Sequence, residues 1–165
     1  FVSSGLPREE WIEKLFPLSI LNPALPSCRS ARKRVRVVVG VSGGVDSAVS
    51  LYALHFLGFD VVPVFMRNWD LPNEETLQCP EPQDMHDAER VCNAIGKKLV
   101  VLDYVKQYWN SVFSPALNVW KEGGTPNPDV FCNTYVKFDS FRREALQRLG
   151  GDFLATGHYC RIGEM

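Results

Sequence analysis

The chain of 165 residues is 45% hydrophobic and 22% charged, with a formal net charge of −1. These values are typical of one globular domain of ordinary size, and they exclude a strongly basic protein that binds nucleic acid over its whole surface. No apolar run approaches the roughly 20 residues that a membrane-spanning helix needs, so we expect no membrane partner.

The first 34 residues are expected to form an N-terminal extension and linker, punctuated by Pro17, Pro23 and Pro26. Residues 35–165 are expected to form the folded domain. The five cysteines are an odd number without a C-x-x-C pair: Cys28, Cys79, Cys92, Cys132 and Cys160. This pattern favours free thiols in a reducing compartment.

Strands and helices alternate in the first half of the domain. The β-branched run at 35–41 predicts a buried strand, and apolar residues at helical spacing predict a helix over 45–57 that ends at Gly58. A strand over 60–66, a helix over 83–95 and a strand over 98–102 follow. This order predicts the α/β class, with a doubly wound parallel sheet and helices on both faces.

The second half is expected to continue the pattern. We predict a helix over 104–121 with a break at Pro115, a Gly/Pro loop over 122–133, a helix over 135–149 and a fourth strand over 152–156. Trp69 and Trp109 are interpreted as core residues rather than platforms for nucleobases.

A glycine-rich turn joins the strongest strand to the strongest helix. Its residues are Gly40, Val41, Ser42, Gly43, Gly44, Val45, Asp46 and Ser47. Unpaired N–H groups at a helix start favour an anion, glycines allow close approach, and serine hydroxyls can donate to phosphate oxygens. Asp46 fits beside phosphates if Mg²⁺ lies between them. The alternative is a simple glycine turn with a serine N-cap. Neither the Walker nor the G-x-G-x-x-G pattern is present.

A second segment, Thr125 to Asn133, carries the other candidate chemistry. Asp129 and Cys132 lie three residues apart, so they share a face if the backbone is helical, and the carboxylate could handle a proton near the sulfur. A helix that begins near Thr134 would favour the Cys132 thiolate, whereas Asp129 would oppose it. Spacing alone fits a buried structural cysteine as well as a nucleophile.

The glycine turn resembles the S-G-G-x-D-S loop of the N-type ATP pyrophosphatases, which cleave ATP between the α and β phosphates. Four further segments are similar to those of the tRNA-specific 2-thiouridylase family, and the match spans about Val35 to Tyr159: Met66-Arg67-Asn68-Trp69-Asp70, Thr125 to Asn133, Val136-Lys137-Phe138 and Ala155-Thr156-Gly157-His158-Tyr159. The resemblance implies an adenine nucleotide alpha hydrolase-like fold and ATP-dependent exchange of oxygen for sulfur at C2 of the wobble uridine of tRNA.

The resemblance also implies roles for individual residues. Gly40 to Ser47 would hold the ATP phosphates, and Met66 and Gly157 would line the adenosine pocket. Asn127, Pro128 and Asp129 would meet the target base, and Cys132 would be the nearer catalytic cysteine. The partners would be tRNA and a persulfide-carrying sulfur-donor protein. The family's own persulfide cysteine is expected beyond Met165, so the chain is expected to be an incomplete fragment of a longer sulfurtransferase.

Several alternatives stay open at this point. The acceptor could be a small molecule, or the chain could be a nucleotide-binding or tRNA-binding module without turnover. His158 fits a pocket wall and a structural hydrogen-bonding role equally well. The extension ahead of Val35 favours a mitochondrial location, with the cytoplasm as the alternative.

Overall fold

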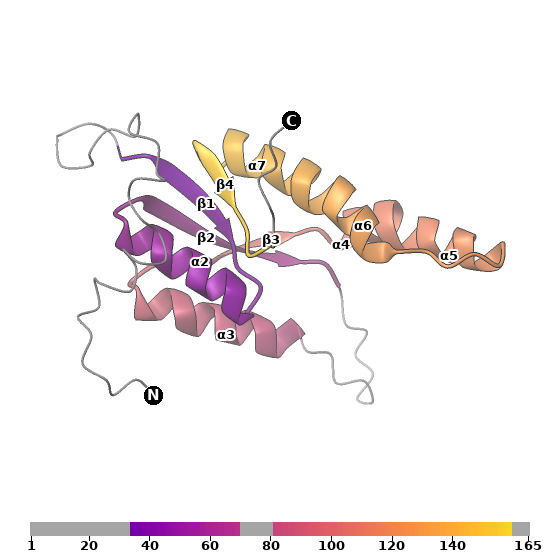
Figure 1. Ribbon diagram of the computed structural model, residues 1–165, viewed down its shortest axis with the longest axis horizontal. Helices are drawn as coiled ribbons and strands as arrows, with labels where there is room; N and C mark the ends of the chain where they lie inside the picture. Colours follow the sequence, from indigo (N-terminus) through magenta and orange to yellow (C-terminus); the bar gives the residue numbers. More distant parts are fainter. Residues whose placement is uncertain (1–33, 70–80, 160–165) are drawn as a thin grey trace. The chain divides into compact units, whose positions relative to one another are not determined.

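A computed structural model describes residues 34–69 and 81–159 of the chain. Most of the predicted N-terminal extension and the segment 70–80 therefore lie outside the described residues. Four strands form one sheet: β1 (Arg36–Gly40), β2 (Asp60–Arg67), β3 (Val100–Asp103) and β4 (Phe153–Ala155). Their order is β3-β2-β1-β4 and every pair is parallel (Figure 1). The predicted parallel sheet is confirmed.

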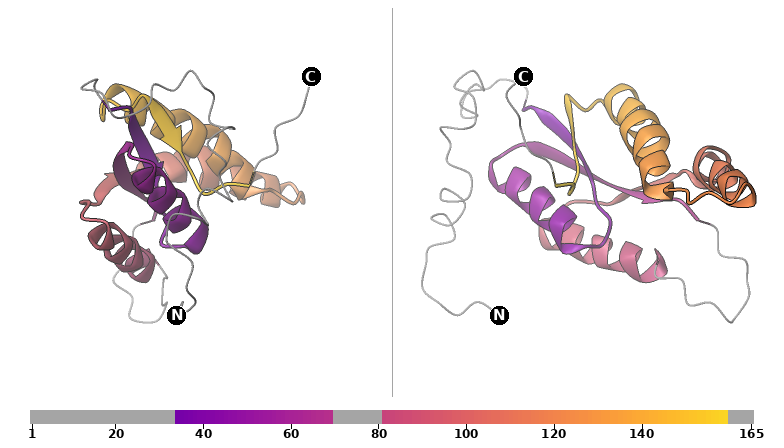
Figure 2. Two further views of the ribbon diagram at one scale, coloured as in Figure 1. Left: turned by 60° about the vertical axis from the view of Figure 1, so that its left-hand side comes forward. Right: turned by 45° about the vertical axis from the view of Figure 1, so that its right-hand side comes forward.

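Helices cover both faces of this sheet (Figure 2). The first face carries α2 (Val45–Phe56) and α3 (Glu81–Ala94). The second face carries two helical runs, which are α4 (Val105–Tyr108), η1 (Trp109–Phe113) and α5 (Ser114–Lys121), then α6 (Pro128–Phe131), η2 (Cys132–Phe141) and α7 (Arg142–Gln147). In the described residues no helix is both long and apolar enough to cross a membrane.

The core divides into two clusters because strand side chains alternate between the faces. In β1, Val37 and Val39 pack with Leu51 of α2, whereas Val38 packs on the opposite side with Phe141 of η2. The β-branched run that predicted a buried strand is thus buried on both sides, as expected for the middle of a parallel sheet.

The two helical runs on the second face differ from the prediction. Pro115 does not break the first run, because it occupies the first turn of α5 directly after the π-helical segment η1. The wider π turn accommodates a ring that would clash with the preceding turn of an α-helix. The second run begins at Pro128, well before the predicted start near Thr134.

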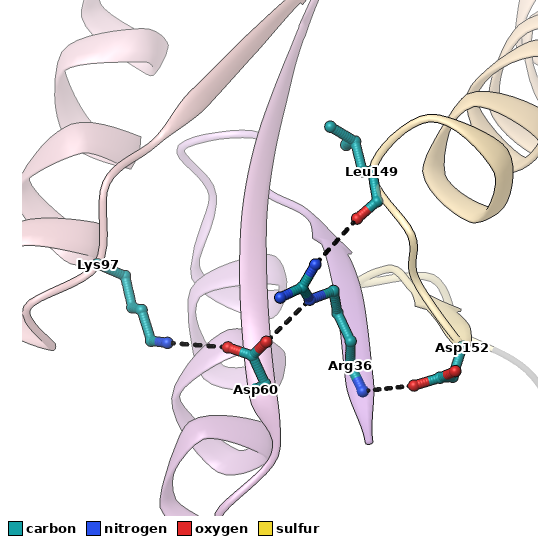
Figure 3. Close-up of polar contacts among 5 residues, drawn as sticks. All are labelled: Arg36, Asp60, Lys97, Leu149 and Asp152. Carbon is teal, nitrogen blue, oxygen red and sulfur yellow. Dashed lines mark hydrogen bonds and ion pairs between the residues drawn. The ribbon is translucent and has the colours of Figure 1, made fainter. Parts of the chain in front are cut away.

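A polar cluster holds the amino-terminal edge of the sheet together (Figure 3). The Arg36 Nε donates to Asp60 Oδ2 at 2.8 Å, and Lys97 Nζ lies 3.4 Å from Asp60 Oδ1. The Arg36 backbone N–H also donates to Asp152 Oδ2 at 2.8 Å. The hydrogen bond and charge of Arg36 hold the pKa of Asp60 below its ordinary value. These contacts join β1 and β2 to the segments that lead into β3 and β4, at the edge opposite the glycine turn.

Candidate functional site

The glycine turn begins where β1 ends and feeds directly into α2. Gly43 has φ +82°, and a Cβ there would lie 2.5 Å from the backbone oxygen of Asp84 in α3. Gly44 is the N-cap of α2, with an extended backbone and no side-chain capping hydrogen bond. Because glycine has no side chain that could cap them, the N–H groups of the first turn of α2 can bind an anion.

Ser47 holds the turn in shape from within. Its side chain is buried, its Oγ accepts from the Ser42 N–H at 3.1 Å, and it lies 2.9 Å from the Gly44 carbonyl oxygen, to which it donates. The Ser42 Oγ lies 3.2 Å from the Ser47 Oγ. Because a hydroxyl has one proton and Ser47 gives its proton to Gly44, Ser42 is the donor in this contact, and its exposed hydroxyl must rotate to donate to a ligand.

The segment after β4 closes against the same turn. A Cβ on Gly157 would lie 2.7 Å from the Ser47 backbone nitrogen and 3.0 Å from the Asp46 carbonyl carbon. A residue with a side chain cannot approach the backbone of α2 so closely. Gly157 therefore allows the two loops to form opposite walls of one site.

A pocket of about 220 Å³ lies between these walls. Eight of the residues predicted to bind nucleotide line it: Gly40, Val41, Ser42, Gly44, Asp46, Ser47, Met66 and Gly157. The predicted residues Gly43 and Val45 belong to the turn but do not line the pocket. Most small-molecule sites measure about 300–1,000 Å³, so this pocket can enclose only part of a nucleotide.

Three further lining residues, Lys137, Thr156 and His158, were not predicted to bind nucleotide. All three belong to motifs that carried the family resemblance, and that resemblance was the signal that could have identified them. Thr156 and His158 flank Gly157 after β4. Lys137 comes from η2, and no helical period could have shown that this face of η2 turns toward the glycine turn.

His158 is both a pocket wall and a structural hydrogen bonder. Its Nδ1 lies 2.9 Å from Thr156 Oγ1, and its Nε2 lies 3.3 Å from Asn133 Oδ1 of η2. Its ring centroid is 5.1 Å from that of Phe138. Burial and then the charge of Lys137 lower the pKa of His158. The contacts tie the loop after β4 to η2.

The second candidate segment, which was predicted as a loop, contains the start of a helix. The Asn127 side chain accepts from the N–H groups of Asp129 at 3.1 Å and Val130 at 3.3 Å, and Pro128 occupies the first turn. This is the usual start of a helix, an Asx cap followed by proline. The cap fixes the exposed Asp129 at a defined place in the first turn.

Cys132 lies inside this helical run, not ahead of it. Only 5% of its surface is exposed, and it packs in the core cluster with Val136 and Tyr104. Burial raises the pKa of the thiol, the charge of Lys137 lowers it, and Asp129 raises it. The expected support of the thiolate by a following helix start is wrong, because the helix starts four residues before Cys132.

Asp46 has its own partner at the mouth of the pocket. The exposed Tyr159 donates its hydroxyl to Asp46 Oδ1 at 3.2 Å, and this contact raises the pKa of Tyr159. Within residues 34–69 and 81–159, no three His, Cys, Asp or Glu side chains gather as a metal site would require. Any Mg²⁺ at Asp46 would thus depend on phosphate oxygens for its other ligands.

Two features lie away from this pocket. A wider hollow of about 500 Å³ is lined by residues between the end of α3 and the start of β3, at the opposite edge of the sheet. Trp69 and Trp109 are 39% and 53% exposed, so their interpretation as core residues is wrong. Trp69 instead packs against the rings of Tyr108 and Phe113, and Trp109 against Phe113.

The fold and the glycine turn define a PP-loop domain of the adenine nucleotide alpha hydrolase-like class. Solved structures share this fold. NMN synthetase from Francisella tularensis has a TM-score of 0.53 at 16% identity, over 90% of this chain and 54% of that chain. The U34-tRNA thiolase NcsA from Methanococcus maripaludis has a TM-score of 0.51 at 20% identity, over 77% of this chain and 39% of that chain.

Sequence comparison identifies the family within this class. The family model described as tRNA methyl transferase HUP domain matches residues 35–165. The mitochondrial tRNA-specific 2-thiouridylase 1 of Drosophila melanogaster is 52% identical over 125 residues, which cover 76% of this chain and 32% of the relative. A tRNA-specific 2-thiouridylase of Staphylococcus epidermidis is 48% identical over 132 residues, 80% of this chain and 35% of the relative. The chain belongs to the tRNA-specific 2-thiouridylase family, and it spans about a third of the length of these relatives.

Proposed function

We propose that the pocket between the glycine turn and Gly157 binds ATP. The uncapped first turn of α2 and the Ser42 hydroxyl would hold the phosphates, with Gly40 to Ser47 as the cradle. Met66 and Gly157 would line the adenosine side. Two close approaches support the proposal, because the left-handed Gly43 directs the turn against α3, and Gly157 brings the loop after β4 against the backbone of the turn.

Asp46 fits a Mg²⁺ ligand in this site. Its carboxylate is exposed and lines the pocket beside the proposed phosphate positions. When bound, Mg²⁺ would neutralise phosphate charge and so favour attack at the α phosphorus. The Tyr159 hydroxyl, which now contacts Asp46, would have to share or release that carboxylate.

We propose that the protein containing this chain uses ATP to thiolate the wobble uridine of tRNA at C2. The observation that carries this proposal is that one helical run contains the candidate base-binding and catalytic residues and also lines the candidate nucleotide pocket. It begins with Asn127, Pro128 and Asp129, continues through Cys132 and contributes Lys137 to the nucleotide pocket. The target base and the nucleotide would therefore meet along η2.

The roles of the residues follow from the chemistry of a C2 carbonyl, which is a poor electrophile. Adenylation of its oxygen, with loss of pyrophosphate, makes AMP the leaving group. The terminal sulfur of a persulfide then replaces AMP at C2. The Cys132 thiolate attacks the other persulfide sulfur, forms a disulfide with it, and leaves the transferred sulfur on the uridine. Asn127, Pro128 and Asp129 would hold the base, and Asp129 could accept the thiol proton.

Replacement of one cysteine tests this function. We expect Cys132→Ser in the full-length protein to abolish 2-thiouridine, measured by mass spectrometry of tRNA after incubation with Mg-ATP and a persulfide donor, while ATP still binds. Cys92→Ala is the matched control, since Cys92 is also a buried free thiol but lies on the other face of the sheet. Equal thiolation by Cys132→Ser and the wild type would refute the role of Cys132.

The acceptor is tested by the products of ATP cleavage. If tRNA is the acceptor, pyrophosphate release should require tRNA carrying an unmodified wobble uridine. Release that depends instead on a small acid or amide donor would show a small-molecule ligase, and ATP binding without release under any condition would show a binding module.

We further propose a mitochondrial location and a separate protein as the persulfide donor. The name of the Drosophila relative supports the location, and the bacterial relatives keep the cytoplasm as the alternative. Immunofluorescence of the tagged full-length protein against a mitochondrial marker checks the location, and a cytoplasmic signal would refute it.

A further inference from the structure

Lys137 lies between the two halves of the proposed site. It lines the nucleotide pocket together with Ser42, Asp46 and Ser47. It also lies on η2, five residues after Cys132, which is the spacing that i→i+5 hydrogen bonds connect in a π-helix. One cation is therefore within electrostatic reach of the thiol on one side and of the phosphate cradle on the other.

The surroundings of Cys132 make this cation important. Asp129 of α6 and the half-buried Tyr108 of α4 both interact electrostatically with the thiol, and Lys137 is the positive group that opposes them. Burial and Asp129 both disfavour a thiolate, so the ammonium of Lys137 is the main influence in the opposite direction.

The lysine side chain is suited to serve two sites. Lys137 is only half-buried, and an ammonium on a flexible four-carbon stem can redirect its three donors. Triphosphate oxygens are strong acceptors that attract such a group. A nucleotide in the pocket would therefore draw the ammonium toward its phosphates and away from Cys132.

We propose that Lys137 is a shared cation: it supports the Cys132 thiolate when no phosphate is in the pocket, and it turns to the phosphates when a nucleotide binds. This inference rests on the proposed ATP site. Its consequence is an order of events, because Cys132 stays a weak nucleophile while the triphosphate is bound and gains reactivity after pyrophosphate leaves. A cysteine that reacted earlier could consume the persulfide before the base is adenylated.

The pH profile of Cys132 alkylation tests the shared cation directly. The full-length protein is treated with iodoacetamide across a pH series, with and without a non-hydrolysable ATP analogue and Mg²⁺, and modification of Cys132 is followed by peptide mass spectrometry. In the wild type we expect the analogue to displace the profile to higher pH and slow the reaction several-fold at neutral pH. Simple shielding would instead lower the plateau rate without displacing the profile.

Variants of Lys137 separate this role from a structural one. Lys137→Met should displace the profile to higher pH without nucleotide, should reduce the additional effect of the analogue, and should weaken analogue binding by at least about tenfold, as loss of a hydrogen bond to a charged group does. Lys137→Arg should restore the wild-type profile, and Lys121→Met on the exposed end of α5 should change nothing.

The outcomes distinguish the two proposals. If the analogue does not bind the wild type, the proposed ATP site is wrong. If it binds but displaces the profiles of the wild type and Lys137→Met equally, or if those two profiles coincide without nucleotide, the shared cation is wrong while the ATP site stands. Thermal unfolding of each variant shows whether the fold is retained. If Lys137→Met does not fold, the wild type keeps the test decisive, because a profile that the bound analogue does not displace would contradict the shared cation.

Discussion

Gly43 and Gly157 are the residues at which the site depends on a missing side chain. Gly43 turns the chain through a left-handed conformation, with φ +82°, against the start of α3. Gly157 brings the loop after β4 onto the backbone of Ser47. The sequence predicted Gly43 in the phosphate loop, and the family resemblance implied Gly157 in the adenosine pocket. The neighbours that require glycine at both positions were not predicted, because they come from α2 and α3.

Two alanine substitutions in the same turn should destabilise the domain to different extents. Gly43→Ala should destabilise the domain by more than about 1 kcal/mol, because a left-handed alanine is strained and its Cβ would overlap Asp84. Gly44→Ala should cost less, since Gly44 has φ −79° and the alanine Cβ would lie 3.5 Å from its nearest neighbour, Ser42 Oγ. Urea unfolding of both variants measures the difference, and equal stability would contradict the described turn.

At the scale of elements, the helical run that starts at Pro128 connects the proposed base-binding and nucleotide-binding halves of the site. Asn127 caps its first turn, and the π-helical η2 carries Cys132 and Lys137 onward from it. The position of Asp129 therefore depends on the Asn127 cap, so a change in the cap should affect any function of Asp129.

Replacement of the cap should separate stability from recognition. Asn127→Ala should lower the free energy of unfolding by about 1 kcal/mol, because two backbone N–H groups lose their acceptor. Asn127→Asp should keep the stability, since aspartate caps as well as asparagine, yet it should still impair thiolation if Asn127 contacts the base. Denaturant unfolding and thiolation assays measure the two effects. Full thiolation by a stable Asn127→Asp would remove Asn127 from the proposed base contacts.

The strands were predicted closely because their signal is local. Each of the four begins and ends within two residues of its predicted bounds, since β-branched runs such as Val37 to Val39 mark a buried strand directly. The start at Pro128 was missed although Asn127-Pro128 carries the usual signal, because the prolines were read as part of a loop. The π-helical segments and the burial of Cys132 depend on packing between helices and sheet, which local patterns do not contain.

At the scale of the whole domain, the candidate site lies at one edge of the sheet and the polar cluster that joins its strands lies at the other. The carboxyl edge carries the glycine turn and the loop after β4, which form the candidate site, as ligand sites do in open parallel sheets. The amino edge carries the cluster of Arg36, Asp60 and Lys97, which joins segments far apart in the chain. Function and stability can therefore be tested separately.

Removal of the Asp60 charge should weaken the fold in a pH-dependent way. The folded-state pKa of Asp60 is lowered by Arg36, so its stabilising contribution is complete above the unfolded-state value of about 4 and is lost as pH falls below it through the folded-state pKa. Asp60→Asn should cost at most about 1 kcal/mol at pH 7, because both partners are partly exposed and water screens them.

The matched control is Glu122→Gln, an exposed position after α5. Urea unfolding between pH 7 and pH 3 should show the gap between the wild type and Asp60→Asn shrinking toward low pH. ATP binding should stay unchanged, since the cluster lies at the opposite edge of the sheet. A gap that grows as pH falls would contradict the described ion pair.

The most direct measurement for the whole account is a crystal structure of the full-length protein with a non-hydrolysable ATP analogue and Mg²⁺. We predict the phosphates against the backbone N–H groups of Gly43 to Ser47, the adenosine beside Met66 and Gly157, and the Lys137 ammonium on a phosphate oxygen. An analogue bound at another place, with the glycine turn bare, would contradict the nucleotide site and every proposal that rests on it.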